Sequence, residues 1–342
     1  MDLLDRKFKI LSAVIERYVL TGEPVGSKAI SEDFDLLFSS ATIRNEMANL
    51  VNFGYLTQPH ISAGRVPSDR GYRLYINKFM PEKLLSVEEK NLLSGLLSTA
   101  SIDPESLLEK ATEVLAEITG FTAIMTTPPN EKSKIRDIKF VQISRRGGML
   151  VLITSGGMVK NKLFRCEYDL NSEILKMFEK IFKEEFRGKY LGEVNAESVN
   201  IMVSSDREIS MLLLPVIDVL LEAVKEANDV KVKIYGQKNL LSIPGITTDM
   251  VIDIFNFLED KNKVLDLFNS DDYGINFIVG EENNYRELKE ASVASAKYNI
   301  AGKSGVLGVI GPTRMDYGAV AMYLQHISSL VGVFLERMLR NE

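Results

Sequence analysis

Hydrophobic residues recur every three or four positions along the first twenty residues of the chain, which is the spacing of an amphipathic helix. The repeating positions are Leu4, Phe8, Leu11, Ile15 and Tyr18. Thr21-Gly22 ends this predicted helix, Pro24 and Gly26 predict a turn, and Ser27 can cap a short second helix. The apolar face of the first helix needs a partner, which the next helices can supply.

The segment that follows predicts a third helix with two unlike faces. Ser39 and Ser40 can cap its start, and Gly54 ends it. Apolar residues at helical spacing form one face: Ile43, Met47, Leu50 and Val51. The other face and its flanks hold small, amide and guanidinium side chains: Ala41, Thr42, Arg44, Asn45, Ala48 and Asn49. Such a face can approach base edges closely and hydrogen-bond to them, as a recognition helix in a DNA major groove does.

Two extended segments come next, the run YLTQPHI and the run RVPSDRGYRLYI, joined by Ser-Ala-Gly. The glycine-containing tip carries Arg65, and Arg70 and Arg73 follow at once. This pattern predicts a β-hairpin wing with phosphate contacts along it, and the order of elements predicts a winged helix-turn-helix. The alternative is an ordinary small α+β domain whose arginines are solvated surface residues.

If the winged-helix interpretation holds, the site residues have distinct roles. Base contacts are expected from Arg44, Asn45 and Asn49. Ser40 and Thr42 suit phosphates or base edges. The wing arginines, Arg65, Arg70 and Arg73, are expected to hold the register on the phosphate backbone.

Beyond the wing the pattern predicts two connecting helices, residues 86–98 and 103–118, and then a meander of antiparallel strands with short glycine turns. The strand runs are GFTAIMTT, IKFVQIS, GMLVLIT and MVKNKLF. Helical patterns interrupt the strands at 171–187 and 206–227, a strand VKVKIYG and a helix over 247–268 follow, and strands return at INFIVG, ASVASAKY and GVLGVIG. A helix over 316–340 closes the chain. The predicted class is therefore α+β, with one element inserted into the second domain.

Two helical segments bear on assembly. In the last helix, apolar residues recur at alternating four- and three-residue spacing, and we favour packing on its own sheet over contact with another protomer. Residues 211–224 are the better dimer candidate, because so apolar a helix in an insertion is expected to have little core of its own.

Charge places nucleic-acid binding in one region only. The chain has 342 residues and a formal net charge of −6, so it is not basic throughout. Residues 40–80 hold five Lys or Arg and two Asp or Glu, and are the best candidate for a cationic footprint. We expect no membrane span, because the most apolar run, MLLLPVIDVLL, is short and contains a proline and an aspartate. We expect no signal segment, because the first helix opens with the acidic run MDLLDR.

Catalytic or metal chemistry has little support in the sequence. The single cysteine, Cys166, excludes an intramolecular disulfide and fits a reducing cytoplasm. The two histidines, His60 and His326, are far apart, and no Cys/His cluster has metal-ligand spacing. No phosphate-binding P-loop is present. We therefore expect no enzyme activity, no catalytic residues, no metal and no cofactor.

Four segments resemble one family: EPVGSKAIS, SSATIRNEMANL, GYLTQPHISAGRVPSDRGYRLYI and, far downstream, GVIGPTRMDYGAV. They are similar to signature segments of the HrcA family of heat-inducible transcription repressors. The resemblance implies a winged-helix domain (1–80), a helical linker (81–119), a GAF-like domain in two segments (120–168 and 235–342) and an inserted dimerisation domain (169–234).

The resemblance also implies a function. A homodimer binds an inverted-repeat operator in double-stranded DNA upstream of chaperone operons, prevents their transcription at normal temperature, and depends on the GroE chaperonin for its active state. An alternative is a winged-helix regulator controlled by a small-molecule effector in the GAF-like domain. Both place the protein in the cytoplasm.

Overall fold

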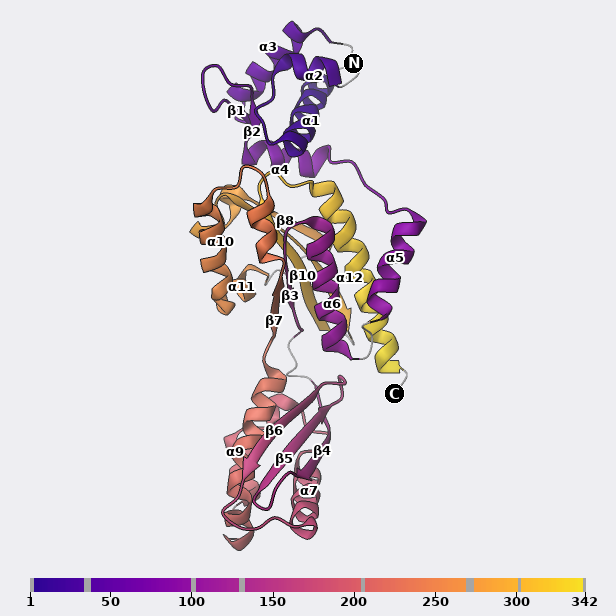
Figure 1. Cartoon of the computed structure of the whole chain (residues 1–342), viewed down its shortest axis with the longest axis vertical. Helices are drawn as coiled ribbons and strands as arrows, with labels where there is room; N and C mark the ends of the chain where they lie inside the picture. Colours follow the sequence, from indigo (N-terminus) through magenta and orange to yellow (C-terminus); the bar gives the residue numbers. More distant parts are fainter. Residues whose placement is uncertain are drawn as a thin grey trace.

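The computed structural model describes residues 3–33, 38–99, 103–128, 133–203, 207–268, 274–300 and 303–340. The elements form three units that follow one another along the long axis of the molecule (Figure 1). The first unit contains the N-terminus, the middle unit is built on a five-stranded sheet, and the third unit is built on a three-stranded sheet. The protein is α+β, as expected from the sequence.

The first unit consists of α1 (Leu3–Thr21), α2 (Ser27–Asp33), α3 (Ser40–Asn52), the short strands β1 (Leu56–Thr57) and β2 (Val66–Pro67), and α4 (Asp69–Lys78). Ser39 caps α3, its hydroxyl accepting a hydrogen bond from the Thr42 amide at 3.2 Å. The apolar sides of α1 and α3 form one core, whose buried members include Ile10, Leu11, Ile43, Met47 and Leu50. The three helices predicted before the hairpin are confirmed.

The second strand of the wing is shorter than the sequence predicted. Only Val66–Pro67 pair with β1, and the following residues form α4. The reason is local: the Ser68 hydroxyl accepts a hydrogen bond from the Gly71 amide at 3.1 Å and caps the helix, and Asp69 lies in the first turn. Arg70 and Arg73 are therefore on a helix and not on the hairpin.

The middle unit is a sandwich of three layers. Its antiparallel sheet has the order β7-β3-β10-β9-β8, with these strands spanning Val232–Tyr235, Thr122–Thr126, Lys303–Pro312, Ala291–Ile300 and Ile275–Val279. One face packs on α6 (Pro104–Thr119) and α12 (Tyr317–Arg340), and the other on α10 (Thr248–Glu259) and α11 (Lys261–Leu267). Short 3-10 helices η2 (Gln237–Ser242), η3 (Gly280–Glu282) and η4 (Arg286–Leu288) connect these layers.

The four strands that were expected to form one meander belong to two different sheets. Strands β4 (Ile135–Gln142), β5 (Gly147–Thr154) and β6 (Val159–Arg165) pair with one another in that order, whereas β3 pairs with β10 and β7 in the middle sheet. Helices α7 (Ser172–Phe186) and α9 (Arg207–Asn228) cover one face of the three-stranded sheet. The segments η1 (Leu191–Glu193) and α8 (Ala196–Val203) lie between them in sequence. Strands β4–β6 thus share a core with residues 172–228 and not with β3.

The core of the third unit also changes the interpretation of residues 211–224. Leu213, Val216, Leu220 and Val224 of α9 are buried against this sheet and α7. The expectation that this helix lacks a core of its own is wrong, because β4–β6 supply one. Met211 and Leu214 remain exposed on its other side.

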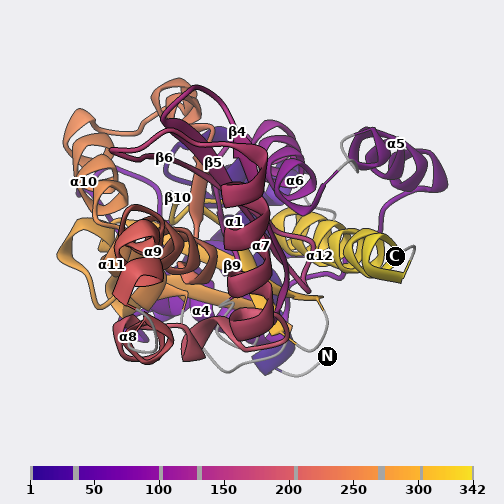
Figure 2. The same ribbon diagram turned by 90° about the horizontal axis from the view of Figure 1, so that it is seen from below.

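Helix α12 packs within its own unit, as favoured from the sequence. Val320, Leu324, Ile327, Val331 and Leu335 are buried against β9 and α6. By length and hydropathy alone, Tyr317–Met338 could cross a membrane, contrary to the expectation of no such segment. Its buried face is part of the middle core. Helix α5 (Val87–Ser98) lies beside α12 on the outside of this layer (Figure 2).

Candidate nucleic-acid interface

The surface of α3 opposite the core is polar and accessible. Ala41, Arg44, Asn45, Ala48 and Asn49 are all exposed. Their positions follow from the helical period, because Ile43, Met47 and Leu50 turn inward toward α1. The three base-contact candidates, Arg44, Asn45 and Asn49, therefore share one exposed surface at the end of the molecule farthest from the third unit (Figure 1).

The start of α3 is held by hydroxyl contacts. Ser40 Oγ lies 3.2 Å from Ser27 Oγ of α2, and Thr42 Oγ1 lies 2.9 Å from Ser39 Oγ. Both site candidates, Ser40 and Thr42, are half-buried. Their first contribution is to join α2 to α3 and to close the first turn, and the N-terminal end of α3 presents the positive end of the helix dipole.

One charged residue of α3 faces inward. Glu46 is only 4% exposed, and its Oε1 accepts hydrogen bonds from Nε of Arg6 at 3.0 Å and from Nη2 of the same residue. Its Oε2 accepts a hydrogen bond from Asn49 Nδ2 at 3.2 Å. Burial raises the pKa of the Glu46 carboxyl, but the hydrogen bonds from Asn49 and Arg6 outweigh it, so the pKa lies below its usual value.

Sequence reasoning did not identify Arg6 and Glu46. Glu46 lies between apolar positions of α3, at a helical position that the core side occupies. A charged residue in such a position, with a complementary charge on the preceding helix, was the available signal. This signal is weak, because an isolated glutamate on a helix is more often solvated.

The β1–β2 hairpin has a constrained tip. Gln58 Nε2 donates to the carbonyl oxygens of Ile61 at 2.8 Å and of Ala63 at 3.1 Å. At its base, Arg65 exchanges backbone hydrogen bonds of 2.8 and 2.9 Å with Val25. Gly64 is required there, because a Cβ would lie 2.5 Å from the Val25 carbonyl. The hairpin is thus tied to the turn between α1 and α2.

The Arg65 side chain turns back along this hairpin. Its Nη1 donates to the Ala63 carbonyl at 3.2 Å, and its Nε is buried without a hydrogen-bond partner in the described part of the chain. His60, at the tip, is exposed. Arg65 is half-buried, so it lies at the base of the hairpin and not at its outermost point.

The remaining two arginines lie on α4, toward the middle unit. The Arg70 guanidinium lies over the ring of Tyr55, 5.7 Å from its centroid, and the residue is exposed. Arg73 is engaged inside the molecule: its Nε donates to Glu282 Oε1 at 2.7 Å, and its Nη2 to the Phe277 carbonyl at 2.7 Å. In this conformation Arg73 joins the first unit to the middle unit.

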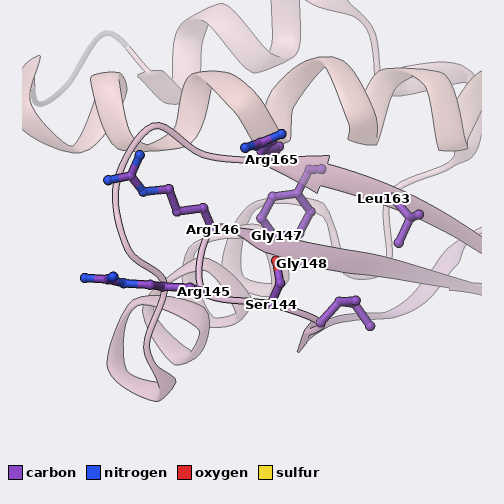
Figure 3. A pocket seen from close by; sticks show the side chains of 9 residues that line it. Ser144, Arg145, Arg146, Gly147, Gly148, Leu163 and Arg165 are labelled. Atoms are coloured by element: carbon purple, nitrogen blue, oxygen red, sulfur yellow. The ribbon is translucent and has the colours of Figure 1, made fainter.

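A second basic surface lies at the opposite end of the molecule. The turn between β4 and β5 carries Arg145 and Arg146, and Arg165 lies across the sheet, opposite Gly147. Figure 3 shows Arg145 and Arg146 extending from the turn away from Leu163, around a shallow pocket. Both arginines pair with Asp169, which partly neutralises their charge.

Within the described ranges, no group of three or more His, Cys, Asp or Glu side chains is arranged to hold a metal ion. Cys166 is buried with a free thiol. The exposed polar groups of α3 and the hairpin are hydrogen-bond donors and acceptors of the kinds that pair with base edges and phosphates.

Three comparisons identify relatives of this chain. The family model for the HrcA protein C terminal domain matches residues 105–321. A protein of Lachnoclostridium phytofermentans described as heat-inducible transcription repressor HrcA is 35% identical over 334 residues, covering 96% of both chains. The protein of the same description from Clostridium acetobutylicum is 33% identical, covering 99% of both.

A solved crystal structure described only as a hypothetical protein has the same fold, with a TM-score of 0.69 and 23% sequence identity. The match covers 97% of this chain and 98% of that chain. Together, the matched family and the full-length relatives bear out the resemblance of the four sequence segments. The chain therefore belongs to the HrcA family of heat-inducible transcription repressors and is a negative regulator of transcription.

Proposed function

We propose that the first unit is a winged helix whose α3 enters the major groove of an operator, with the β1–β2 hairpin as its wing. The observation that carries this proposal is the single exposed polar surface formed by Arg44, Asn45 and Asn49 on α3. Amide and guanidinium groups at these positions match the donor and acceptor pattern of purine edges. Ser40 and Thr42 at the start of α3, with Arg65 and Arg70, are the proposed phosphate contacts.

A role for Arg73 in DNA binding is proposed only for a conformation in which it leaves Glu282. As long as the guanidinium is bound to that carboxylate, its charge is compensated inside the molecule. We therefore rank Arg73 below Arg65 and Arg70 among the proposed backbone contacts. This ranking follows from charge and from geometry alike.

We propose that the protein acts as a homodimer on an inverted repeat, joined through the third unit. The face of the β4–β6 sheet away from α7 and α9 carries exposed apolar side chains in cross-strand rows, notably Val141, Val159 and Leu163. A second copy covering this face would bury them. Two-fold symmetry of such a dimer would match the symmetry of an inverted repeat. In place of the expected 169–234, we propose 133–231 as the inserted dimerisation domain, because β4–β6 share a core with α7 and α9, and we propose the middle unit as GAF-like.

The family suggests which genes the protein represses and how its activity is regulated. We propose that the operator lies upstream of chaperone operons, that occupancy excludes polymerase at normal temperature, and that the GroE chaperonin supports the active state. Because stability margins of proteins are small, modest heating can empty the operator through loss of the dimer or of the folded first unit. The buried free thiol of Cys166 fits the cytoplasm, the compartment we propose.

Replacement of Asn49 by Ala tests the proposed function. We expect weaker binding of the operator by about 1–3 kcal/mol with little change on random-sequence DNA, because a base contact is lost. Fluorescence anisotropy with both duplexes measures this difference, and Lys176→Ala, at an exposed position of α7 in the third unit, is the control. Equal losses on both duplexes would contradict the assignment of α3.

A second candidate is control by a small effector. One pocket opens between α1 and the middle unit, lined by residues that include Val19, Phe121, Arg314 and Tyr323. Arg314 Nη2 is buried and without a hydrogen-bond partner in the described ranges. A bound carboxylate would meet this donor and contact both units. Thermal-shift screening with small carboxylic acids tests this candidate, and a saturable rise in melting temperature that also releases operator would support it.

A further inference from the structure

The carboxylate of Glu46 divides its two oxygens between two different partners. Oε1 accepts both hydrogen bonds from the Arg6 guanidinium, and Oε2 accepts from Asn49 Nδ2 at 3.2 Å. An ionised carboxylate has no proton to donate, so the Asn49 amide must turn its nitrogen, and not its oxygen, toward Glu46. The orientation of this amide is therefore dictated chemically by a buried neighbour.

This orientation determines what Asn49 presents to DNA. With one N–H of Nδ2 bound to Glu46, the second N–H and the carbonyl oxygen Oδ1 remain on the exposed side of α3. One donor beside one acceptor is the pattern that pairs with adenine in the major groove, where N7 accepts and the N6 amino group donates. Guanine offers two acceptors, O6 and N7, and does not match it.

We propose that Glu46 is a specificity-determining positioning residue, which fixes the amide of Asn49 so that it selects adenine over guanine. The inference rests on the proposed function, namely that α3 contacts bases. Glu46 itself is buried and does not touch DNA. Arg6 of α1 contributes to this positioning, because it occupies Oε1 of Glu46 and leaves only Oε2 of Glu46 for Asn49.

Replacement of Glu46 by Gln inverts this arrangement in a predictable way. Arg6 has only donors, so Oε1 of the new amide must face Arg6 and its Nε2 must face Asn49. Asn49 then turns its oxygen inward to accept from Nε2, and both of its N–H groups point outward. Two outward donors match the two acceptors of guanine. Glu46→Gln should therefore change the preferred base and not merely weaken binding.

The experiment is selection of bound duplexes from a randomised DNA library by the full-length protein, followed by affinity measurements on the selected sequences. The wild type should select adenine at the position whose preference Asn49→Ala abolishes. Glu46→Gln should favour guanine there, with a shift in the adenine-to-guanine affinity ratio of about tenfold or more. The matched control, Glu23→Gln, changes an exposed glutamate of the first unit in the same way and should keep the adenine preference.

Two further measurements distinguish a role of Glu46 in base selection from a purely structural role of Glu46. In an Asn49→Ala background, Glu46→Gln should no longer affect this base position, because it acts through Asn49. If Glu46→Gln fails to fold, as judged by thermal melting, purine analogues test the wild type instead: 7-deazaadenine lacks N7, purine lacks the N6 amino group, and each should weaken binding at that position. Loss with 7-deazaadenine alone would overturn the inference.

The proposed function and this inference can fail separately. A folded wild type that selects no sequence from the library contradicts binding by α3. A wild type that selects a sequence, together with a Glu46→Gln variant that selects the same base at the Asn49 position, contradicts only the role of Glu46.

Discussion

The Arg73 guanidinium on α4 binds the Glu282 carboxylate through two nitrogen atoms and also donates to the Phe277 carbonyl at 2.7 Å. Glu282 Oε2 also accepts a hydrogen bond from the Val279 amide at 2.8 Å. These contacts join a helix of the first unit to the end of β8 and to η3 in the middle unit. The orientation of α3 relative to the middle unit therefore depends partly on one ion pair.

Replacement of Arg73 by Ala should lower the free energy of unfolding by about 1–3 kcal/mol, because charge-assisted hydrogen bonds are lost and Glu282 remains partly buried without its partner. Chemical denaturation monitored by circular dichroism measures the loss. Lys78→Ala, an exposed change on the same helix, should alter stability by no more than about 0.5 kcal/mol. Similar losses for both variants would show that the pair contributes nothing specific.

The ion pair between Arg73 and Glu282 predicts that the free energy of unfolding depends on pH. Burial raises the pKa of the Glu282 carboxyl, but the hydrogen bonds from Arg73 and the Val279 amide outweigh it, so the pKa in the folded protein lies below its usual value. A lowered pKa means that this stabilisation is complete above the unfolded-state value of about 4.3 and is lost as pH falls through the folded-state pKa. The stability difference between wild type and Glu282→Gln should be constant from pH 6 to 8 and shrink below about pH 4.5.

The neighbouring Asp69 has an effect of opposite sign, because burial raises its pKa and the charge of Glu282 adds to that rise. Repeating the comparison in an Asp69→Asn background therefore isolates Glu282. A difference that stays unchanged down to pH 3 would contradict the ionised pair.

Gly280 lies where η3 of the middle unit contacts Asp69 of α4 in the first unit. Its φ is +50°, and a Cβ there would lie 2.1 Å from an Asp69 carboxylate oxygen, which accepts a hydrogen bond from the Glu281 amide at 2.9 Å. Gly280→Ala should therefore weaken the contact between α4 and η3 in addition to straining the backbone, which itself costs about 1 kcal/mol.

The matched control is Gly245→Ala. Gly245 has a φ of +74°, but its added Cβ would meet nothing closer than 3.6 Å. Hydrogen exchange of α4 amides should accelerate in Gly280→Ala and not in Gly245→Ala. Equal acceleration in both would mean that backbone strain, and not the clash with Asp69, is responsible.

Arg65 should contribute to DNA affinity without contributing to sequence preference. Its charge lies at the base of the hairpin, where the proposed contact is a phosphate. Arg65→Ala should weaken binding to operator and random DNA alike and reduce the slope of log affinity against log salt by about 0.9, the value for one phosphate. Lys176→Ala, at an exposed position of α7 in the third unit, should leave that slope unchanged.

The free face of the β4–β6 sheet predicts the effect of a charge on assembly. Leu163 is 70% exposed and lies opposite Met149 in the sheet register. Leu163→Lys should shift the protein from dimer to monomer in sedimentation equilibrium, because a charge cannot be buried cheaply in an apolar contact. Leu241→Lys, at a similarly exposed leucine of the middle unit, is the control and should leave the dimer intact.

Much of the local structure could be predicted from the sequence, because it depends on neighbours along the chain. The capping serines predicted the starts of α3 and α5, and the three- and four-residue apolar spacing predicted the inward faces of α1 and α3. The same reasoning correctly separated the exposed Asn45 from the buried Ile43. It did not predict α4, because Ser68, which caps this helix, lies in a run whose pattern predicts an extended segment.

The pairing of distant segments could not be predicted in this way. Periodicity identified β3 and β4 as strands, but not that β3 pairs with β10 while β4 pairs with β5 in another sheet. Strand pairing depends on which apolar faces meet, and that is settled among segments more than a hundred residues apart. The contact of Arg73 with Glu282 could not be predicted for the same reason, since the two residues are 209 positions apart.

The amino-acid sequence by itself determined most of the secondary elements other than α4, the polar face of α3 and the family, because each of these depends on residue identity and short-range spacing. The tertiary structure alone decided which charges are free and which are engaged. Hydrogen-bond partners such as Arg6 for Glu46, and Glu282 for Arg73, are brought together only when the units pack. A side chain's chemistry is local, but its availability depends on its neighbours in space.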